Sequence, residues 1–109
     1  MLNTMRVFVT HNPEDLAAYY GRALPELRLL TERDGAPIDV VLNPLERDLT
    51  TSELIEAATG CDVIVAHRAT PGEAELFAAL PDLVAFLRCA VDISTVDVDA
   101  ASAAGVLVA

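Results

Sequence analysis

Short apolar runs and helical patterns alternate along this chain of 109 residues, and this alternation constrains its fold more than any other feature. The runs are rich in Val, and most lack the strict polar alternation of a half-exposed strand. Strands covered on both faces of a parallel sheet have this character. The predicted strands span residues 6–10, 38–42, 62–66, 83–87 and 106–108.

Helix signals fill the intervals between these runs. Asn12 can cap a helix that begins at Pro13, and Gly21 and Pro25 are expected to break that helix into two pieces. Three further helices are predicted. The first follows a capping box at residues 50–53, the second spans residues 72–80, and the third spans residues 98–104 after a cap at Asp97.

The resulting order of elements, βαβαβαβαβ, predicts an α/β fold with a doubly wound parallel sheet. Five strands suggest the flavodoxin-like order 2-1-3-4-5. This fold usually ends with a further helix, whereas the sequence stops at Ala109 directly after the last apolar run. We therefore expect residues 1–109 to be one domain of a longer protein whose last helix is missing here. An uncovered sheet face also makes a homodimer conceivable.

The charge balance excludes several classes of partner. Acidic residues outnumber basic ones 17 to 7, which gives a formal net charge of −10, and the chain contains no Lys. Nucleic acids and anionic membranes are thus not expected as main partners, because binding to them depends on Lys and Arg. No apolar run reaches the ~18 residues of a membrane span, and no secretory signal is visible. We expect a cytoplasmic protein.

Ligands of open α/β sheets bind beyond the carboxyl ends of the strands, where the strand order reverses. In the predicted sheet this point lies between loops 10–13 and 67–72, which carry His11 and His67. Two interpretations stay open: both histidines are exposed loop residues, or at least one faces a shared crevice as a ligand contact or proton carrier. No metal site is expected, because two histidines without a third convergent ligand are a weak signal.

Two arginines follow predicted strands at the same edge. Arg68 comes after the third strand, and Arg88 comes directly after the apolar run of the fourth. Each guanidinium can offer a planar fork to a carboxylate or a phosphate. Alternatively, Arg68 is a surface residue that balances the charge of an acidic domain. For Arg88 the alternative is a buried ion pair with Asp92.

The two cysteines, Cys61 and Cys89, lie at opposite ends of the third and fourth predicted strands. In neighbouring parallel strands this offset is roughly 16 Å, which is far beyond the reach of a disulfide. Both are expected to be reduced. Arg88 could lend Cys89 some thiolate character, but a packed, inert thiol is the expectation.

Known users of this fold need residues that are lacking here. The loop after the first strand, with Glu14 and Asp15, is acidic and would repel a flavin phosphate. A phosphorelay receiver needs an acceptor Asp at the end of the third strand, where this chain has Ala66, and a Lys. No GxGxxG or GxxxxGK sequence is present. The residues alone therefore predict an anion-binding crevice without a catalytic constellation.

The sequence CDVIVAHRATPGEAELFAALPDLVAFLRCAVDISTVDVDAASAAGVLVA, residues 61–109, resembles the end of the substrate-binding domain of D-isomer-specific 2-hydroxyacid dehydrogenases. Residues 1–60 agree with that family in layout only. The matching residues are Ala69-Thr70-Pro71, Pro81-Asp82-Leu83, Arg88, Val96-Asp97, Ala100-Ala101 and Gly105-Val106.

The resemblance implies an NAD- or NADP-dependent parent enzyme that oxidises a D-2-hydroxy acid or reduces a 2-oxo acid by hydride transfer. The nucleotide-binding domain would follow in the same polypeptide, so no catalytic or cofactor-binding residue is assigned in this chain, and alone it is expected to be inactive. The implied substrate-binding residues are His67, Arg68, Ala69, Thr70, Arg88, Cys89, Ala90, Val91 and Asp92.

The chain departs from the family pattern within these two segments. His67-Arg68 replaces Arg-Ser, and Ala90 and Asp92 replace two glycines of a turn whose amides hold the substrate carboxylate in the family. Asp92 adds negative charge there, which bears on the class of substrate. The alternative hypotheses are a stand-alone binding or regulatory module for a small anion or a partner protein, and a receiver-like domain without its phosphoacceptor.

Overall fold

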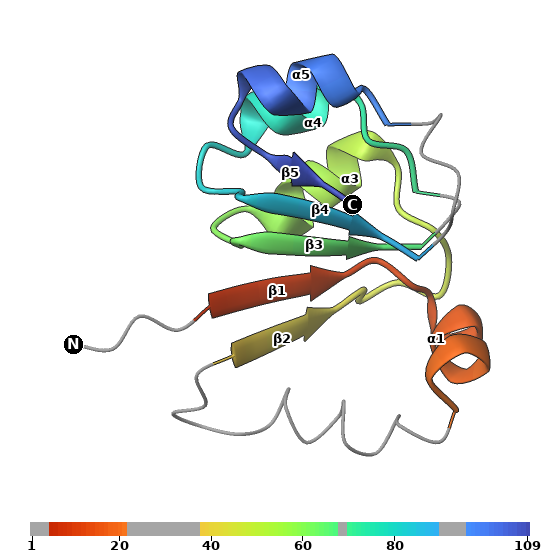
Figure 1. Cartoon of the computed structure of the whole chain (residues 1–109). Helices are drawn as coiled ribbons and strands as arrows, with labels where there is room; N and C mark the ends of the chain where they lie inside the picture. Colours follow the sequence, from red (N-terminus) through yellow and green to blue (C-terminus); the bar gives the residue numbers. More distant parts are fainter. Residues whose placement is uncertain (1–4, 22–37, 68–69, 90–95) are drawn as a thin grey trace.

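The computed structural model describes residues 5–21, 38–67, 70–89 and 96–109 (Figure 1). They form one five-stranded sheet with the order β2-β1-β3-β4-β5, in which every neighbouring pair is parallel. The predicted α/β fold and its strand order are confirmed. The strands are β1 (Met5–Val9), β2 (Ile38–Leu42), β3 (Val63–Ala66), β4 (Ala85–Arg88) and β5 (Leu107–Val108).

Three of the four described helices, α1, α3 and α5, begin at the predicted caps. The Asn12 side chain accepts a hydrogen bond from the amide of Asp15, and Thr50 and Glu53 form the predicted reciprocal capping box. The second piece expected after Gly21 falls at residues that the structure does not describe. The helices are α1 (Pro13–Tyr20), α3 (Thr51–Ala58), α4 (Ala74–Ala79) and α5 (Val98–Ala103).

Two elements begin two residues later than predicted, for identifiable reasons. β4 begins at Ala85 instead of residue 83, because the Leu83 amide donates to the Leu80 carbonyl in a turn, 3.2 Å away. α4 begins at Ala74 instead of residue 72, because Gly72 pairs with Val96 in an isolated bridge. Leu83 and Gly72 are therefore buried without belonging to the predicted strand or helix.

One face of the sheet carries the main core. Phe8, Ile64 and Phe86 are fully buried there beneath α3, α4 and α5. The rings of Phe77 and Phe86 meet edge to face, with centroids 5.7 Å apart. Since α3, α4 and α5 all lie on this side (Figure 1), burial of these apolar side chains is the main force that holds them to the sheet.

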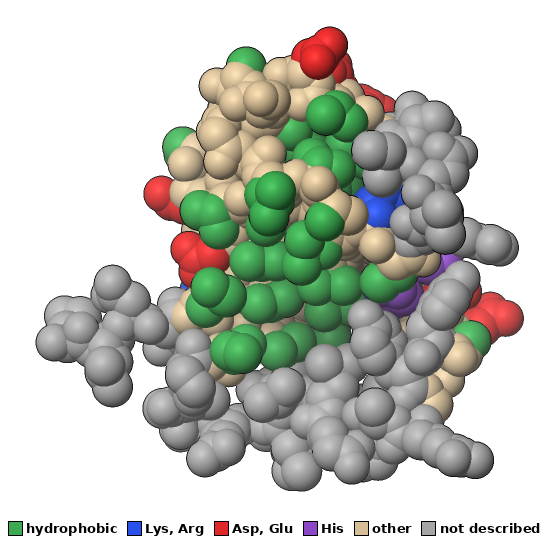
Figure 2. All heavy atoms as spheres, viewed as in Figure 1, with side chains coloured by type: hydrophobic (Ala, Val, Ile, Leu, Met, Phe, Trp, Pro, Cys, Tyr) green, Lys and Arg blue, Asp and Glu red, His purple; other side chains and the backbone are tan. Residues whose placement is uncertain are grey.

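The opposite face is apolar as well, but it is less covered. Leu16 of α1 is buried against Val9 and Val40, while Leu107 of β5 remains 65% exposed. Figure 2 shows apolar side chains spread across this face. The expected exposure of apolar surface beside the last strand is therefore present. None of the helices in the described ranges has the length and apolar character that a membrane span requires.

The amino ends of the strands form the edge opposite the predicted site. Arg6 lies here, with its Nε 3.3 Å from a carboxylate oxygen of Asp39 and its amide donating to Asp62 at 2.8 Å. This edge supplies a cation that is separated from the carboxyl ends by the full length of the strands.

Candidate functional site at the carboxyl edge of the sheet

Both histidines lie together at the carboxyl ends of β1 and β3. His11 is 1% exposed and His67 is 6% exposed, so the interpretation as exposed loop residues is wrong. Their ring centroids are 5.2 Å apart in an edge-on arrangement. Because β1 and β3 are neighbours in the sheet, the residues that follow them meet in the interior of this edge, near the point where the strand order reverses.

A threonine pair connects the loops that follow β1 and β3. Thr10 Oγ1 lies 2.8 Å from Thr70 Oγ1, and it also accepts a hydrogen bond from the His67 amide at 2.9 Å. The Thr70 amide donates to the His67 carbonyl at 2.8 Å. Thr10 and Thr70 are both buried. These bonds satisfy polar groups away from water and hold Thr70, a predicted substrate-binding residue, against the end of β1.

Asn43 adds the end of β2 to this network. Its side-chain amide donates to the Thr10 carbonyl at 3.1 Å and to the Arg47 carbonyl at 2.9 Å. Its side-chain oxygen accepts from the Leu45 amide at 2.9 Å. A single buried amide therefore fixes the path of the loop between β2 and α3 relative to β1.

Two acidic groups lie near His67: Asp15 of α1 and Asp48 of the loop between β2 and α3. The His67 Nε2 atom lies 3.4 Å from Asp15 Oδ2. The Asn12 side-chain amide donates to Asp15 at 2.9 Å and to Asp48 at 3.1 Å. One ligand-type atom from each of Asp15, Asp48 and His67 lies within 4.8 Å of the others. The sequence analysis considered only the two histidines and missed this convergence.

Burial governs the electrostatics of His11. It lowers the pKa of the imidazole, and the neighbouring His67 lowers it further, while Asp15 and Asp48 act in the opposite direction. His11 therefore favours its neutral form relative to a histidine in water.

Arg88 and Cys89 bring the end of β4 to the same edge. Arg88 is opposite Ala66 in the register of β3 and β4, and its side chain is partly buried. The Cys89 amide donates to the Ala66 carbonyl at 2.9 Å, directly before His67. The ends of β3 and β4, which carry the two predicted substrate-binding segments, are thus adjacent.

The cysteines are both thiols, as expected, but they differ in exposure. Cys61 is buried, and burial raises its thiol pKa. Cys89 is exposed, so the expected packed thiol is wrong at this position. The expectation rested on the lack of a nearby base in the sequence, whereas the residue lies one position beyond the end of β4.

Five of the nine predicted substrate-binding residues lie outside the described part of the chain: Arg68, Ala69, Ala90, Val91 and Asp92. The ion pair considered between Arg88 and Asp92 falls there too. The four described residues, His67, Thr70, Arg88 and Cys89, follow or end the adjacent strands β3 and β4.

The additional residues of the edge carried weak signals in the sequence. Asn12 and Asp15 were explained fully by helix capping, and Asn43 followed a predicted strand without a motif. Asp48 had no signal at all, because its position depends on the path of the loop between β2 and α3.

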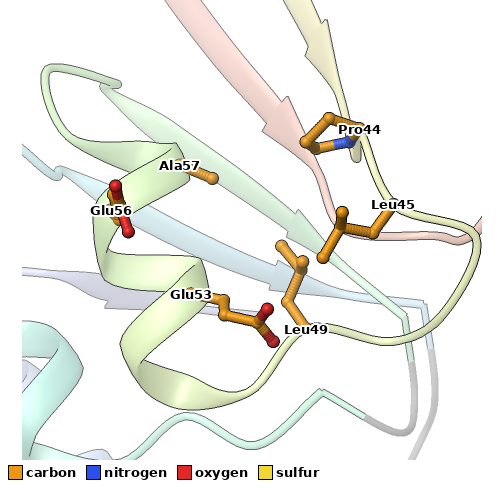
Figure 3. Close-up of a pocket in the computed structure, with 6 residues that line it drawn as sticks. All are labelled: Pro44, Leu45, Leu49, Glu53, Glu56 and Ala57. Carbon is orange, nitrogen blue, oxygen red and sulfur yellow. The ribbon is translucent and has the colours of Figure 1, made fainter.

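A separate hollow of about 300 Å³ lies between α3 and the loop after β2 (Figure 3). Figure 3 shows Leu45 and Leu49 pointing into the space beside the helix. The Glu53 carboxylate on its rim is held by two hydrogen bonds of 2.7 Å from Arg47. The described residues that line this hollow are Pro44, Leu45, Leu49, Glu53, Glu56 and Ala57, and none of them is a predicted substrate-binding residue.

Comparison with known sequences gives one family. The family described as D-isomer specific 2-hydroxyacid dehydrogenase, catalytic domain, matches residues 17–109. A search of curated proteins finds none that matches this chain.

Solved structures reproduce the fold. An NAD⁺-bound 3-phosphoglycerate dehydrogenase of Entamoeba histolytica superposes with a TM-score of 0.73 at 18% identity, over 97% of this chain and 32% of that one. D-lactate dehydrogenase of Escherichia coli gives a TM-score of 0.65 at 17% identity, over 96% and 30%. A D-isomer specific 2-hydroxyacid dehydrogenase of Lactobacillus delbrueckii, complexed with NAD, gives 0.65 at 15%, over 96% and 29%. The chain thus spans about a third of the length of these proteins.

Proposed function

The chain belongs to the D-isomer specific 2-hydroxyacid dehydrogenase family, and on this premise we propose that it is the substrate-binding part of an NAD- or NADP-dependent oxidoreductase. The parent enzyme would oxidise the CH–OH group of a D-2-hydroxy acid or reduce a 2-oxo acid. Residues 1–109 would form its substrate-binding domain, and the nucleotide-binding domain of the same polypeptide would supply the cofactor site.

One observation carries the proposal for the site. The Cys89 amide donates to the Ala66 carbonyl at 2.9 Å, so the segments that begin at His67 and Arg88 leave the sheet side by side. These are the two segments that the family resemblance assigns to the substrate. A ligand held by both would lie beyond the carboxyl ends of the strands, as in other open α/β sheets.

Arg88 is the group that we propose for recognition of the substrate carboxylate. Its guanidinium can donate two parallel hydrogen bonds to a carboxylate. The chain is strongly acidic and has no Lys, so arginines must provide the attraction for an anion. Thr70 lies on the neighbouring loop and is fixed through Thr10, which would limit the freedom of that wall of the site.

The cofactor belongs to the parent enzyme in this proposal. Two of the similar structures are described as bound to NAD, and the chain itself has no GxGxxG sequence. The isolated chain is therefore expected to bind NAD(H) negligibly and to have no dehydrogenase activity, because hydride transfer requires the cofactor.

The proposal is tested by titrating the isotope-labelled chain with pyruvate and following backbone amide NMR shifts. The largest shifts are expected at His67, Thr70, Arg88 and Cys89. Propionate, which has the carboxylate but lacks the 2-oxo group, separates general anion binding from recognition of a 2-oxo acid. Shifts that are scattered over the surface, or confined to the hollow beside α3, would contradict the assignment.

A matched pair of variants sharpens the test. Arg88→Gln is expected to weaken pyruvate binding by about tenfold or more, since a charge-assisted hydrogen bond contributes ~1.5–3 kcal/mol. Arg6→Gln makes the same chemical change at the opposite edge of the sheet and is expected to leave binding unchanged. Equal losses in both variants would indicate a nonspecific charge effect.

The alternative of a stand-alone binding or regulatory module is not favoured by the family match. It predicts that pyruvate causes no localised shifts at the carboxyl edge, whereas another anion or a partner protein does. The same NMR experiment therefore separates the two hypotheses.

A further inference from the structure

Asp15, Asp48 and His67 come from three separate segments and converge at one point. Asp15 is in the first turn of α1, Asp48 is in the loop between β2 and α3, and His67 follows β3. One donor atom from each lies within 4.8 Å of the other two. We propose that these three side chains bind a divalent transition-metal ion of the zinc or manganese class. This inference does not depend on the proposed function, and it departs from the expectation based on the two histidines alone.

The donor set determines the class of ion. One imidazole nitrogen and two carboxylate oxygens suit Zn²⁺, Mn²⁺ or Fe²⁺, whereas Mg²⁺ and Ca²⁺ prefer oxygen ligands only. Three protein ligands leave at least one coordination position for water. The site would therefore be an open one rather than a closed structural site with four side chains.

The spacing already approaches that of a metal site. Bonds of ~2.1 Å place the ligand atoms of a tetrahedral site ~3.4 Å apart, and His67 Nε2 is 3.4 Å from Asp15 Oδ2. Asp48 is exposed, so rotation of its side chain can bring its oxygen the remaining distance without repacking the core.

Asn12 holds the two carboxylates toward each other. Its side-chain amide donates to Asp15 at 2.9 Å and to Asp48 at 3.1 Å. Two carboxylates repel each other at this range, and a neutral amide only partly offsets that repulsion. A divalent cation would offset it fully, while Asn12 could keep its hydrogen bonds as an outer support of the ligands.

Arg47 does not neutralise the Asp48 carboxylate in place of a metal cation. The Arg47 guanidinium forms two hydrogen bonds of 2.7 Å with Glu53 and one of 3.2 Å with the Asp48 backbone carbonyl. The Asp48 side chain accepts a hydrogen bond from the Asn12 amide. The guanidinium charge is therefore directed to α3 rather than to this cluster.

The first experiment uses the metal-stripped full chain and needs no variant. Substoichiometric Mn²⁺ is added to the isotope-labelled protein, and paramagnetic broadening of its NMR signals is mapped. Broadening centred on Asp15, Asp48 and His67 supports the site. Broadening centred elsewhere, or spread evenly over the acidic surface, overturns it.

The second experiment measures affinity. Calorimetric titration with Zn²⁺ is expected to give one equivalent bound to the unaltered chain. Asp48→Asn is expected to weaken binding at least tenfold. Because Asp48 is exposed, the variant is expected to keep the fold, which circular dichroism checks. Asp82→Asn, an equivalent change at an exposed position before β4, is the control. Equal affinities in the Asp48 and Asp82 variants contradict the proposal.

The exposed Cys89 could bind zinc independently, so the ligand atoms are identified with Co²⁺. Nitrogen and oxygen ligands give weak visible bands only, whereas thiolate ligation adds an intense near-ultraviolet charge-transfer band. The proposal predicts the former spectrum, unchanged by Cys89→Ser. A thiolate band that disappears in Cys89→Ser would assign the metal to the cysteine and overturn the proposed ligand set.

Discussion

Thr10 Oγ1 and Thr70 Oγ1 lie 2.8 Å apart, and this buried contact joins two residues that are 60 positions apart in the sequence. Thr10 also accepts the His67 amide at 2.9 Å. Thr10 lies outside the predicted substrate-binding segment that begins at His67, and its hydroxyl fixes the beginning of that segment.

Thr10→Val is expected to lower the free energy of unfolding by about 1–3 kcal/mol, because it removes the acceptor of a buried amide while keeping the volume. Thr70→Val removes only the hydroxyl contact and is expected to cost about 0.5–1.5 kcal/mol. Urea unfolding of both variants and of the double variant measures the coupling. The prediction fails if Thr10→Val is no more destabilising than Thr70→Val.

Gly72 is expected to tolerate no side chain. A Cβ atom at this position would lie 2.9 Å from Val96 Cγ1 and 3.3 Å from the rings of Phe77 and Phe86. Gly72→Ala should therefore lower the free energy of unfolding by about 1–3 kcal/mol through overpacking. Adding Val96→Ala to this variant relieves the shortest contact.

The control for Gly72 is Gly21→Ala, because a Cβ built there has no neighbour within 4 Å among the residues that the structure describes. Gly21 is the C-cap of α1, and its substitution is expected to lower the free energy of unfolding by less than Gly72→Ala does, because it causes no overpacking. Similar losses at both positions, measured by thermal unfolding, would show that crowding at Gly72 is not the cause.

Glu53 is expected to make the free energy of unfolding depend on pH. Hydrogen bonds from Arg47, and then from the Thr50 amide, hold its pKa at about 2, below the ordinary value of 4.5. The folded state therefore favours the ionised form. This contribution is present above pH 4.5 and is lost as the pH falls toward 2.

Glu53→Gln should accordingly reduce the stability difference between neutral and acidic solution, measured by urea unfolding at several pH values. Glu56→Gln, one turn away on the exposed side of α3, removes the same charge without the Arg47 contact. If the two variants show the same pH dependence, the contact between Arg47 and Glu53 does not produce the effect.

The two cysteines are expected to react at different rates with a thiol reagent. Cys89 is exposed, whereas Cys61 is buried and has a raised thiol pKa. In the folded chain Cys61 should react at least about a hundredfold more slowly than Cys89, because the reagent reaches it only after local opening of the structure. Cys89→Ser removes the fast phase, and denaturant makes both thiols equivalent. A fast phase that survives in Cys89→Ser would contradict the assigned burial.

The sequence alone determined the architecture. Alternating runs of Val-rich strands and capped helices predicted the parallel sheet and its order, because apolar periodicity and caps such as Asn12 and Thr50 act over a few residues. The short runs of matching residues between positions 61 and 109 also indicated the family, because each run consists of neighbouring residues in the sequence.

The tertiary structure decided which side chains meet at the carboxyl edge. His11 and His67 are buried together rather than exposed, because β1 and β3 are adjacent although the end of β1 at Val9 and the start of β3 at Val63 are 54 positions apart. Asp48 joins Asp15 and His67 only because Asn43 and Asn12 fix the loop after β2. Such contacts depend on chain paths between elements, and local propensity carries no information about them.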